Sequence, residues 1–233
     1  MNPFEISESF KNFDEPYPKP KDFVQVVKNA IPREKSEIVR LWLSEGIPYA
    51  FKHCPILYET IRGWLANKLN IHPKEITLIG SARIGFSLAP PPALGKPFSR
   101  DSDLDFNAIS EKLFKQCAKA FRLWSGDFSN RVVSPRHSTE KFYWDTNFKT
   151  VPENIKRGFI DPYKIPTFDR YPIAKKIQNA IWMLHEKLNI TDNAPRARKL
   201  SVRVYIDWSA FIRQFIINLT YAIKKLNMQN TSS

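Results

Sequence analysis

The sequence predicts a mixed α/β protein of the α+β type, in which helices at both ends flank a small mixed sheet. Two kinds of pattern support this. Apolar residues recur at steps of three and four, as on one face of a helix, in 57–69, 114–124, 173–188 and 211–226. Short apolar, alternating or β-branched runs, typical of strands, occupy 76–79, 103–109 and 200–207.

The first 47 residues are predicted to form a strap followed by two helices. Residues 1–20 are predicted to form a tail across the surface. Two helices are predicted after it, in KDFVQVVKNA and REKSEIVRLWLSEG, and Gly46 and Pro48 end the second. The chain has 18 prolines and 7 glycines, and many of the prolines lie in 16–20, 90–97 and 152–172. Because proline is disfavoured inside helices, we expect these stretches to be extended connectors.

Residues 48–125 are predicted to form the core. A helix beginning at Pro55 precedes KEITLIGS, an apolar strand that stops at Gly80 and Ser81 and enters a further helix at ARIG. A proline-rich segment then leads to SRDSDLDFNAI, in which Leu104 and Phe106 alternate with the aspartates. A period of two places Asp103 and Asp105 on one strand face, opposite the core.

Residues 126–233 are predicted to complete the core and add helices. Polar turns and aromatic patches alternate over 125–170 and indicate no regular element there. The stripe from Ile173 to Leu188 predicts a helix, LSVRVYID a strand, and the stripe from Phe211 to Leu226 a long final helix. The second half of the chain is also the basic one, since residues 121–233 carry 19 Lys and Arg against 9 Asp and Glu.

Composition narrows the class of protein. A net charge of +13 favours phosphate-bearing partners. Two cysteines, Cys54 and Cys117, cannot form a disulfide framework, and no Cys/His cluster offers the ligands of a structural zinc site. The polar N-terminus is unlike a signal peptide, and no apolar stretch is long enough to span a membrane, so we expect a cytoplasmic protein without a membrane partner.

Two weak motifs carry the chemistry. Asp103 and Asp105 can bind one hard divalent cation, although a solvated strand edge with two acids is the simpler interpretation of an isolated DLD. The turn at Gly80 and Ser81 can hold a phosphate, although strands often end in Gly-Ser for steric reasons alone. The order of the two motifs along the chain, an apolar strand ending in Gly-Ser and then a strand with two alternating aspartates, indicates a phosphate and metal site more specifically than either motif alone.

Joined as IGSARIGFS and SDLDF, these motifs resemble the polymerase-β-like nucleotidyltransferase superfamily, best over residues 55–125. Within it the chain looks most like bacterial enzymes of anti-phage defence, namely cyclic-oligonucleotide synthases and Hailong-type synthases of DNA oligomers. The resemblance implies a nucleotidyltransferase core of a small mixed sheet with flanking helices.

The resemblance also implies roles for individual residues. Gly80, Ser81, Arg83 and Ser102 would bind the NTP or dNTP, while Asp103 and Asp105 would bind Mg²⁺ or Mn²⁺ and carry catalysis. Ser81 and Asp103 are 22 residues apart, more than is usual in the superfamily. The insert between them could cover the site as a lid that brings Lys96 and Arg100 to phosphate, or it could be an inert loop.

The superfamily commonly adds a third catalytic carboxylate on a later strand. Asp207, after the β-rich run VRVYI, is the first choice, and Asp145 in KFYWD is the second. Asp207 also precedes the last helix, where aspartate is a favoured N-cap and stabilises a helix by about 1 kcal/mol without catalysis.

The other notable residues have simple alternatives. Lys199 and the arginines of PRARKLSVR could line a groove for nucleic acid or triphosphate, or form a solvated loop. Tyr143 and Trp144 are better candidates for base stacking than Trp124 and Trp182, which adjoin helical apolar stripes and are expected to lie in the core. The four histidines show no ligand spacing, and none is assigned to a site.

We therefore expect a nucleotidyltransferase that moves a nucleoside monophosphate onto a hydroxyl, releases pyrophosphate and makes oligonucleotides without a template. A separate effector protein would respond to the product. One alternative is a toxin-like transferase that modifies tRNA or protein. It would use the same Gly80, Ser81, Asp103 and Asp105. The other is a non-catalytic module that binds nucleic acid through its basic half.

Overall fold

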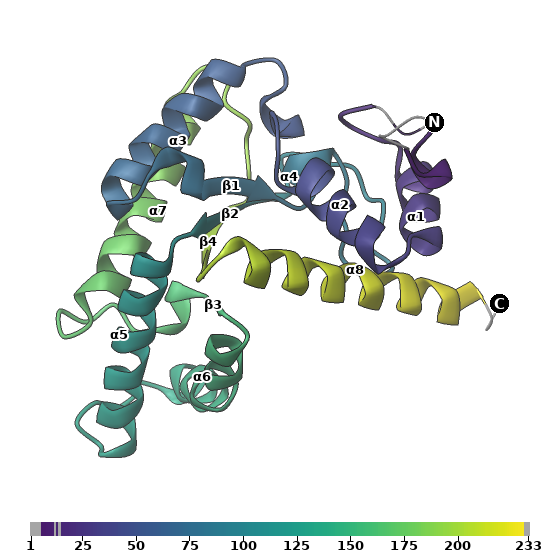
Figure 1. Ribbon diagram of the computed structural model, residues 1–233. Helices are drawn as coiled ribbons and strands as arrows, with labels where there is room; N and C mark the ends of the chain where they lie inside the picture. Colours follow the sequence, from purple (N-terminus) through teal and green to yellow (C-terminus); the bar gives the residue numbers. More distant parts are fainter. Residues whose placement is uncertain (1–5, 12, 14, 231–233) are drawn as a thin grey trace.

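A four-stranded mixed sheet occupies the centre of the molecule, between two groups of helices (Figure 1). The computed structural model describes residues 6–11, 13 and 15–230. The strand order is β1-β2-β4-β3. The α+β class predicted from the sequence is therefore confirmed.

The elements follow the predicted order. The strands are β1 (Ile76–Ile79), β2 (Asp103–Ile109), β3 (Phe159–Ile160) and β4 (Lys199–Tyr205). The α-helices are α1 (Pro20–Asn29), α2 (Pro32–Leu43), α3 (Pro55–Leu69), α4 (Ser81–Ile84), α5 (Glu111–Ser129), α6 (Ser138–Lys156), α7 (Pro172–Ile190) and α8 (Trp208–Asn230). Short 3-10 helices cover 8–10, 49–51, 73–75 and 162–164.

Proline defines several helix starts. Helices α1, α2, α3 and α7 each begin with proline in the first turn, where its missing N–H costs no helical hydrogen bond. The sequence predicts that 152–172 is an extended connector. This prediction is wrong for Pro152, which lies within α6 near its C-terminal end. The segment 125–170, which showed no regular pattern, holds α6 and β3.

The register of the sheet determines what lies beside the two aspartates. Strand β1 pairs antiparallel with β2, so that Ile79 faces Asp105. Strand β4 runs parallel to β2, with Lys199 beside Asp103 and Ser201 beside Asp105. The predicted strand from the last third of the chain therefore lies directly next to the strand that carries both aspartates.

One face of the sheet is fully covered. Leu104, Phe106 and Val204 point into a core with α3, α5 and α7 and are completely buried. The opposite face is covered only at the end near Ile109 and Tyr205, where a second apolar cluster joins it to α1, α2 and α8. The start of β2, which carries Asp103 and Asp105, remains accessible on this second face.

A buried carboxylate ties α5 to the start of α7. Asp127 accepts two hydrogen bonds from the Arg170 guanidinium, at 2.6 and 3.1 Å, and one from the Tyr171 hydroxyl at 2.9 Å. The hydrogen bonds from Arg170 hold the pKa of Asp127 below its usual range.

We expect Asp127→Asn to lower the unfolding midpoint at pH 7, because Arg170 and Tyr171 lose a charged acceptor. A lowered carboxylate pKa stabilises the fold above the unfolded value of about 3.9 and ceases to do so as pH falls through the folded value. The difference between wild type and variant should therefore shrink below pH 4. Thermal unfolding from pH 2 to 7 measures it, and a constant difference would contradict this role.

No helix in the described part of the chain combines the length and the apolar character needed to cross a bilayer. Cys54 and Cys117 are both free.

Candidate functional site

A cavity of about 590 Å³ opens on the accessible face of the sheet. Its floor is formed by the end of β1 and the start of β2, and one wall by the insert between α4 and β2. Helix α8 forms the opposite side with Phe215, Asn218, Leu219 and Tyr221. Gly80, Ser81, Ser102, Asp103 and Asp105 all line this cavity. Because the resemblance described above implies catalysis for Asp103 and Asp105, we call it the catalytic cavity.

The turn at Gly80 brings β1 against the two aspartates. Gly80 has φ +67° and ψ −148°, a conformation that residues with a side chain rarely adopt. A Cβ atom placed on Gly80 would lie 3.9 Å from the Asp105 Oδ2 atom. Glycine therefore allows the chain to turn sharply while it remains close to the carboxylate of Asp105.

Asp105 is the more buried of the two carboxylates. Its Oδ1 atom accepts a 2.6 Å hydrogen bond from the Ser201 hydroxyl. Burial raises the pKa of Asp105, and the charge of Asp103 raises it further, while Ser201 and two nearby cations oppose the shift. A bound cation would offset the unfavourable charge of Asp105.

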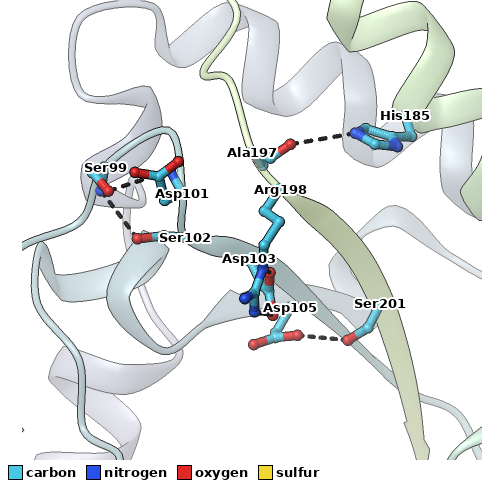
Figure 2. A network of polar contacts seen from close by, with 9 residues as sticks. All are labelled: Ser99, Asp101, Ser102, Asp103, Asp105, His185, Ala197, Arg198 and Ser201. Carbon is cyan, nitrogen blue, oxygen red and sulfur yellow. Dashed lines mark hydrogen bonds and ion pairs between the residues drawn. The ribbon is translucent and has the colours of Figure 1, made fainter. Parts of the chain in front are cut away.

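Asp103 is paired with an arginine. The Arg198 guanidinium donates to both oxygens of Asp103, each at 3.1 Å. Figure 2 shows the Arg198 side chain extending to Asp103. Arg198 is fixed at its backbone, where its N–H donates to the Ser102 carbonyl at 3.0 Å. On the far side, the Nε2 atom of His185 lies 3.3 Å from the Ala197 carbonyl oxygen.

The insert between Ser81 and Asp103 is part of the site. Ser87, Leu88, Lys96 and Ser99 line the catalytic cavity, whereas Arg100 does not. Backbone hydrogen bonds, including Ser87 N–H to Lys96 O at 2.8 Å, hold the insert together. Of the two sequence interpretations, a covering segment agrees better with this placement than an inert loop.

Ser102 lies at the edge of the cavity and supports the insert. Its hydroxyl accepts a 3.0 Å hydrogen bond from the Ser99 backbone N–H, as Figure 2 shows. Asp101, which the sequence interpretation did not single out, also lines the cavity.

Arg83 is not brought to this cavity. It is 4% exposed, lies against Gly46 and lines a separate hollow beside α2. Burial lowers the pKa of Arg83. Its place in the turn of α4 directs it away from the aspartates, so its predicted contact with nucleotide has no support in the geometry.

Neither candidate for the third carboxylate reaches the cavity. The Asp207 Oδ1 atom accepts a 2.7 Å hydrogen bond from the Ala210 N–H, and Asp207 thus caps α8. It lies six residues beyond Ser201, which is about 20 Å along an extended chain. Asp145 lies in α6, not in a strand, and pairs with Lys141 at 2.7 Å.

The described residues contain no group of three or more Asp, Glu, His or Cys side chains suited to a metal ion. Ser201 occupies the β4 position beside Asp105. The sequence analysis missed Ser201 and the pairing of Arg198 with Asp103, because both depend on a strand pairing that joins residues about a hundred positions apart.

A third side chain on the same strand face is also polar. Asn107 follows Asp105 by two residues and is completely buried. Among the described residues, neither its Oδ1 nor its Nδ2 atom has a hydrogen-bond partner. The side-chain amide of Asn107 is therefore a buried polar group that lacks a hydrogen bond to any described residue, beneath the floor of the site.

The donor set suits a hard divalent cation. The carboxylates of Asp103 and Asp105, two positions apart on β2, both line the cavity, and burial makes the charge of Asp105 unfavourable. Carboxylate oxygens are the ligands that Mg²⁺ and Mn²⁺ prefer, with nucleotide phosphates and water completing the shell. The fit requires Arg198 to release Asp103.

We expect Arg198→Ala to bind Mn²⁺ several-fold more tightly than wild type when nucleotide is absent, because both oxygens of Asp103 become free. Electron paramagnetic resonance of free Mn²⁺ measures this affinity. Lys199→Ala removes a neighbouring positive charge that makes no hydrogen bond to Asp103 and serves as the matched control. Equal affinity in the two variants would show that Arg198 does not compete with the ion.

Comparison of the chain with family models, curated proteins and solved structures gave no match.

Proposed function

We propose that this protein is a metal-dependent nucleotidyltransferase that transfers a nucleoside monophosphate from an NTP or dNTP to a hydroxyl, building oligonucleotides without a template. The main support is the juxtaposition of Gly80 with Asp105 and Asp103 at the floor of one cavity. The resemblance of IGSARIGFS and SDLDF to the polymerase-β-like superfamily assigns the same residues to this chemistry. Two motifs that are weak alone thus meet at one place.

Each residue at the floor has a chemical role in this proposal. Asp103 and Asp105 hold the divalent cation, and the Ser201 hydroxyl orients Asp105 through its hydrogen bond. The Ser81 hydroxyl and the Lys96 ammonium line the cavity and can bind the triphosphate. When bound, Mg²⁺ or Mn²⁺ neutralises charge on the phosphates and activates the acceptor hydroxyl.

The volume and charge of the catalytic cavity agree with a nucleotide substrate. A volume of about 590 Å³ lies within the range of small-molecule sites. Lys96 lines it without an acidic partner among the described residues and can bind phosphates, whereas Arg198 and Arg203, which also line it, are paired with Asp103 and Asp161. In the bacterial enzymes that the chain resembles, such products act in anti-phage defence through a separate effector, and we extend that role to this protein.

A non-catalytic module that binds nucleic acid is the second candidate, and one observation favours it. Arg198 neutralises Asp103 through two hydrogen bonds, so the aspartate pair does not need a cation to be stable. In that case the raised pKa of Asp105 would reflect only burial and Asp103.

Incubation of the purified protein with labelled NTPs and dNTPs and either Mg²⁺ or Mn²⁺ separates these functions. We expect free oligonucleotides and pyrophosphate. Label that appears only on added tRNA or protein would favour the toxin-like transferase. Binding of nucleic acid that weakens with salt, with no turnover under any condition, would favour the module.

A further inference from the structure

Two further cavities adjoin the catalytic cavity in sequence, each sharing lining residues with the one before it. The first, of about 290 Å³, lies between α7, β4 and residues 162–163, and it shares Arg198 with the catalytic cavity. The second, of about 700 Å³, lies against α6 and shares Tyr163, Gln178 and Lys199 with the first. We call these two cavities together the side track.

Three large aromatic side chains are exposed along the side track. Trp182 is 64% exposed, Tyr143 58% and Tyr163 53%. The sequence analysis placed Trp182 with the core because it adjoins the stripe of α7, and that expectation is wrong. Trp144 is buried, so Tyr143 is the accessible member of that pair. Exposed aromatic faces in a hollow are suited to flat ligands that stack.

The charge of the side track is positive. Lys199 lines its first cavity, which has no acidic lining residue among those described, and Arg198 lines it as well while paired with Asp103. The one acid that lines the second cavity is Glu140, and Arg136 neutralises it at 3.1 Å. The Lys199 ammonium lies 5.4 Å from the centre of the Tyr163 ring. A positive charge therefore lies close to an exposed aromatic face.

We propose that the side track binds the single strand of an oligonucleotide acceptor, with bases stacked on Trp182 and Tyr163 and phosphates beside Lys199 and Arg198. Alternating flat apolar faces and positive charges match a strand of bases joined by phosphates. A duplex is excluded by this chemistry, because its bases are already stacked on one another. Since Arg198 also lines the catalytic cavity, the strand leads toward Asp103.

This inference rests on the proposed function, because it names the acceptor for the same catalytic cavity. It also gives a role to part of the basic cluster PRARKLSVR, since Arg198 lines both the catalytic cavity and the side track and Lys199 lines the side track, whereas Arg196 lines neither. Arg198 is then positioned to contact the acceptor when it is not paired with Asp103.

Fluorescence anisotropy with a labelled single-stranded oligonucleotide tests the side track without any need for turnover. A length of about ten nucleotides is within the site sizes of single-strand binding proteins. We expect Trp182→Ala and Tyr163→Ala each to weaken binding by about tenfold, as stacking energies imply. Trp182→Phe, which retains an aromatic face, should recover most of the affinity.

Trp208→Ala is the matched control, because Trp208 is an exposed aromatic residue that lines neither the catalytic cavity nor the side track. It should bind as wild type does. Unchanged affinity in both Trp182→Ala and Tyr163→Ala would overturn the side track. Equal affinity for a single strand and for a duplex would also overturn it. Displacement of the strand by polyglutamate at equal charge would overturn it as well and would indicate an acidic protein partner instead.

The two proposals fail in different ways. Strand binding that depends on Trp182, with no nucleotide transfer under any condition, would retain the side track as a nucleic-acid site and remove only the reaction. Nucleotide transfer by a protein whose strand binding does not respond to either aromatic substitution would keep the enzyme and remove the side track.

Discussion

Asp103→Asn is expected to reduce metal-dependent nucleotide transfer by roughly a thousandfold, since a metal ion supplies several kcal/mol of charge stabilisation to such reactions. The fold should be retained, because the substitution relieves the repulsion between Asp103 and Asp105 on the same strand face. Steady-state rates with Mg²⁺ and with Mn²⁺, together with thermal unfolding, measure both outcomes. Wild-type turnover in a folded Asp103→Asn protein would contradict the mechanism.

Asp207→Asn and Asp145→Asn are the matched controls for this experiment. Asn is as good an N-cap as Asp, so Asp207→Asn preserves the cap of α8 at Ala210. Asp145 makes only an exposed ion pair with Lys141, which contributes little to stability. Both variants should keep turnover near that of wild type. A loss comparable to that of Asp103→Asn would place the affected carboxylate in the reaction.

Gly80→Ala is expected to lower turnover more than tenfold and to destabilise the fold by about 1–3 kcal/mol, the cost of holding a residue with a side chain at such dihedral angles. Its Cβ atom would meet Asp105 Oδ2 only at an ordinary contact distance of 3.9 Å. The strain therefore comes from the backbone, and relaxation of the turn would move Ser81 relative to the aspartates. Thermal unfolding measures the loss of stability, and the kcat and KM for nucleotide measure the loss of turnover.

Gly63→Ala is the control for Gly80→Ala. Gly63 lies within α3, and a Cβ atom there would meet nothing within 4 Å. Alanine in a helix interior is favoured over glycine by about 0.5–1 kcal/mol, so Gly63→Ala should be more stable than wild type and equally active. Equal effects of the two substitutions on turnover would show that the geometry at Gly80 has no special role.

Local sequence patterns predicted most of the elements that form the floor of the site. The alternation around Leu104 and Phe106 correctly placed Asp103 and Asp105 on the face opposite the core. The apolar run that ends in Gly-Ser correctly predicted β1 and the sharp turn after it. These features depend on residues within a few positions of one another, and their periods are therefore visible in one sequence.

The partners of the aspartates could not be predicted, because they depend on the direction in which β4 pairs with β2. Parallel pairing places the start of β4, with Arg198 and Ser201, beside Asp103 and Asp105. The same direction places the end of β4, and Asp207 after it, beside the end of β2 instead. A β-rich run followed by aspartate does not reveal this orientation.

The position of a side chain around a helix was a second limit. Trp182 follows Ile181 of the α7 stripe by one residue, a rotation of about 100° on a helix, which carries it out of the core. A residue adjacent to an apolar stripe can be buried or exposed, and only the packing of α7 against its neighbours decides.

The most direct test of the central claim is mass spectrometry of the products that the purified protein makes from all eight NTPs and dNTPs with Mg²⁺ or Mn²⁺. We expect oligonucleotides and pyrophosphate from the intact protein and neither from Asp103→Asn. Absence of any product from the intact protein, also with single-stranded oligonucleotide or tRNA present, would contradict the central claim. So would equal product from the Asp103→Asn protein.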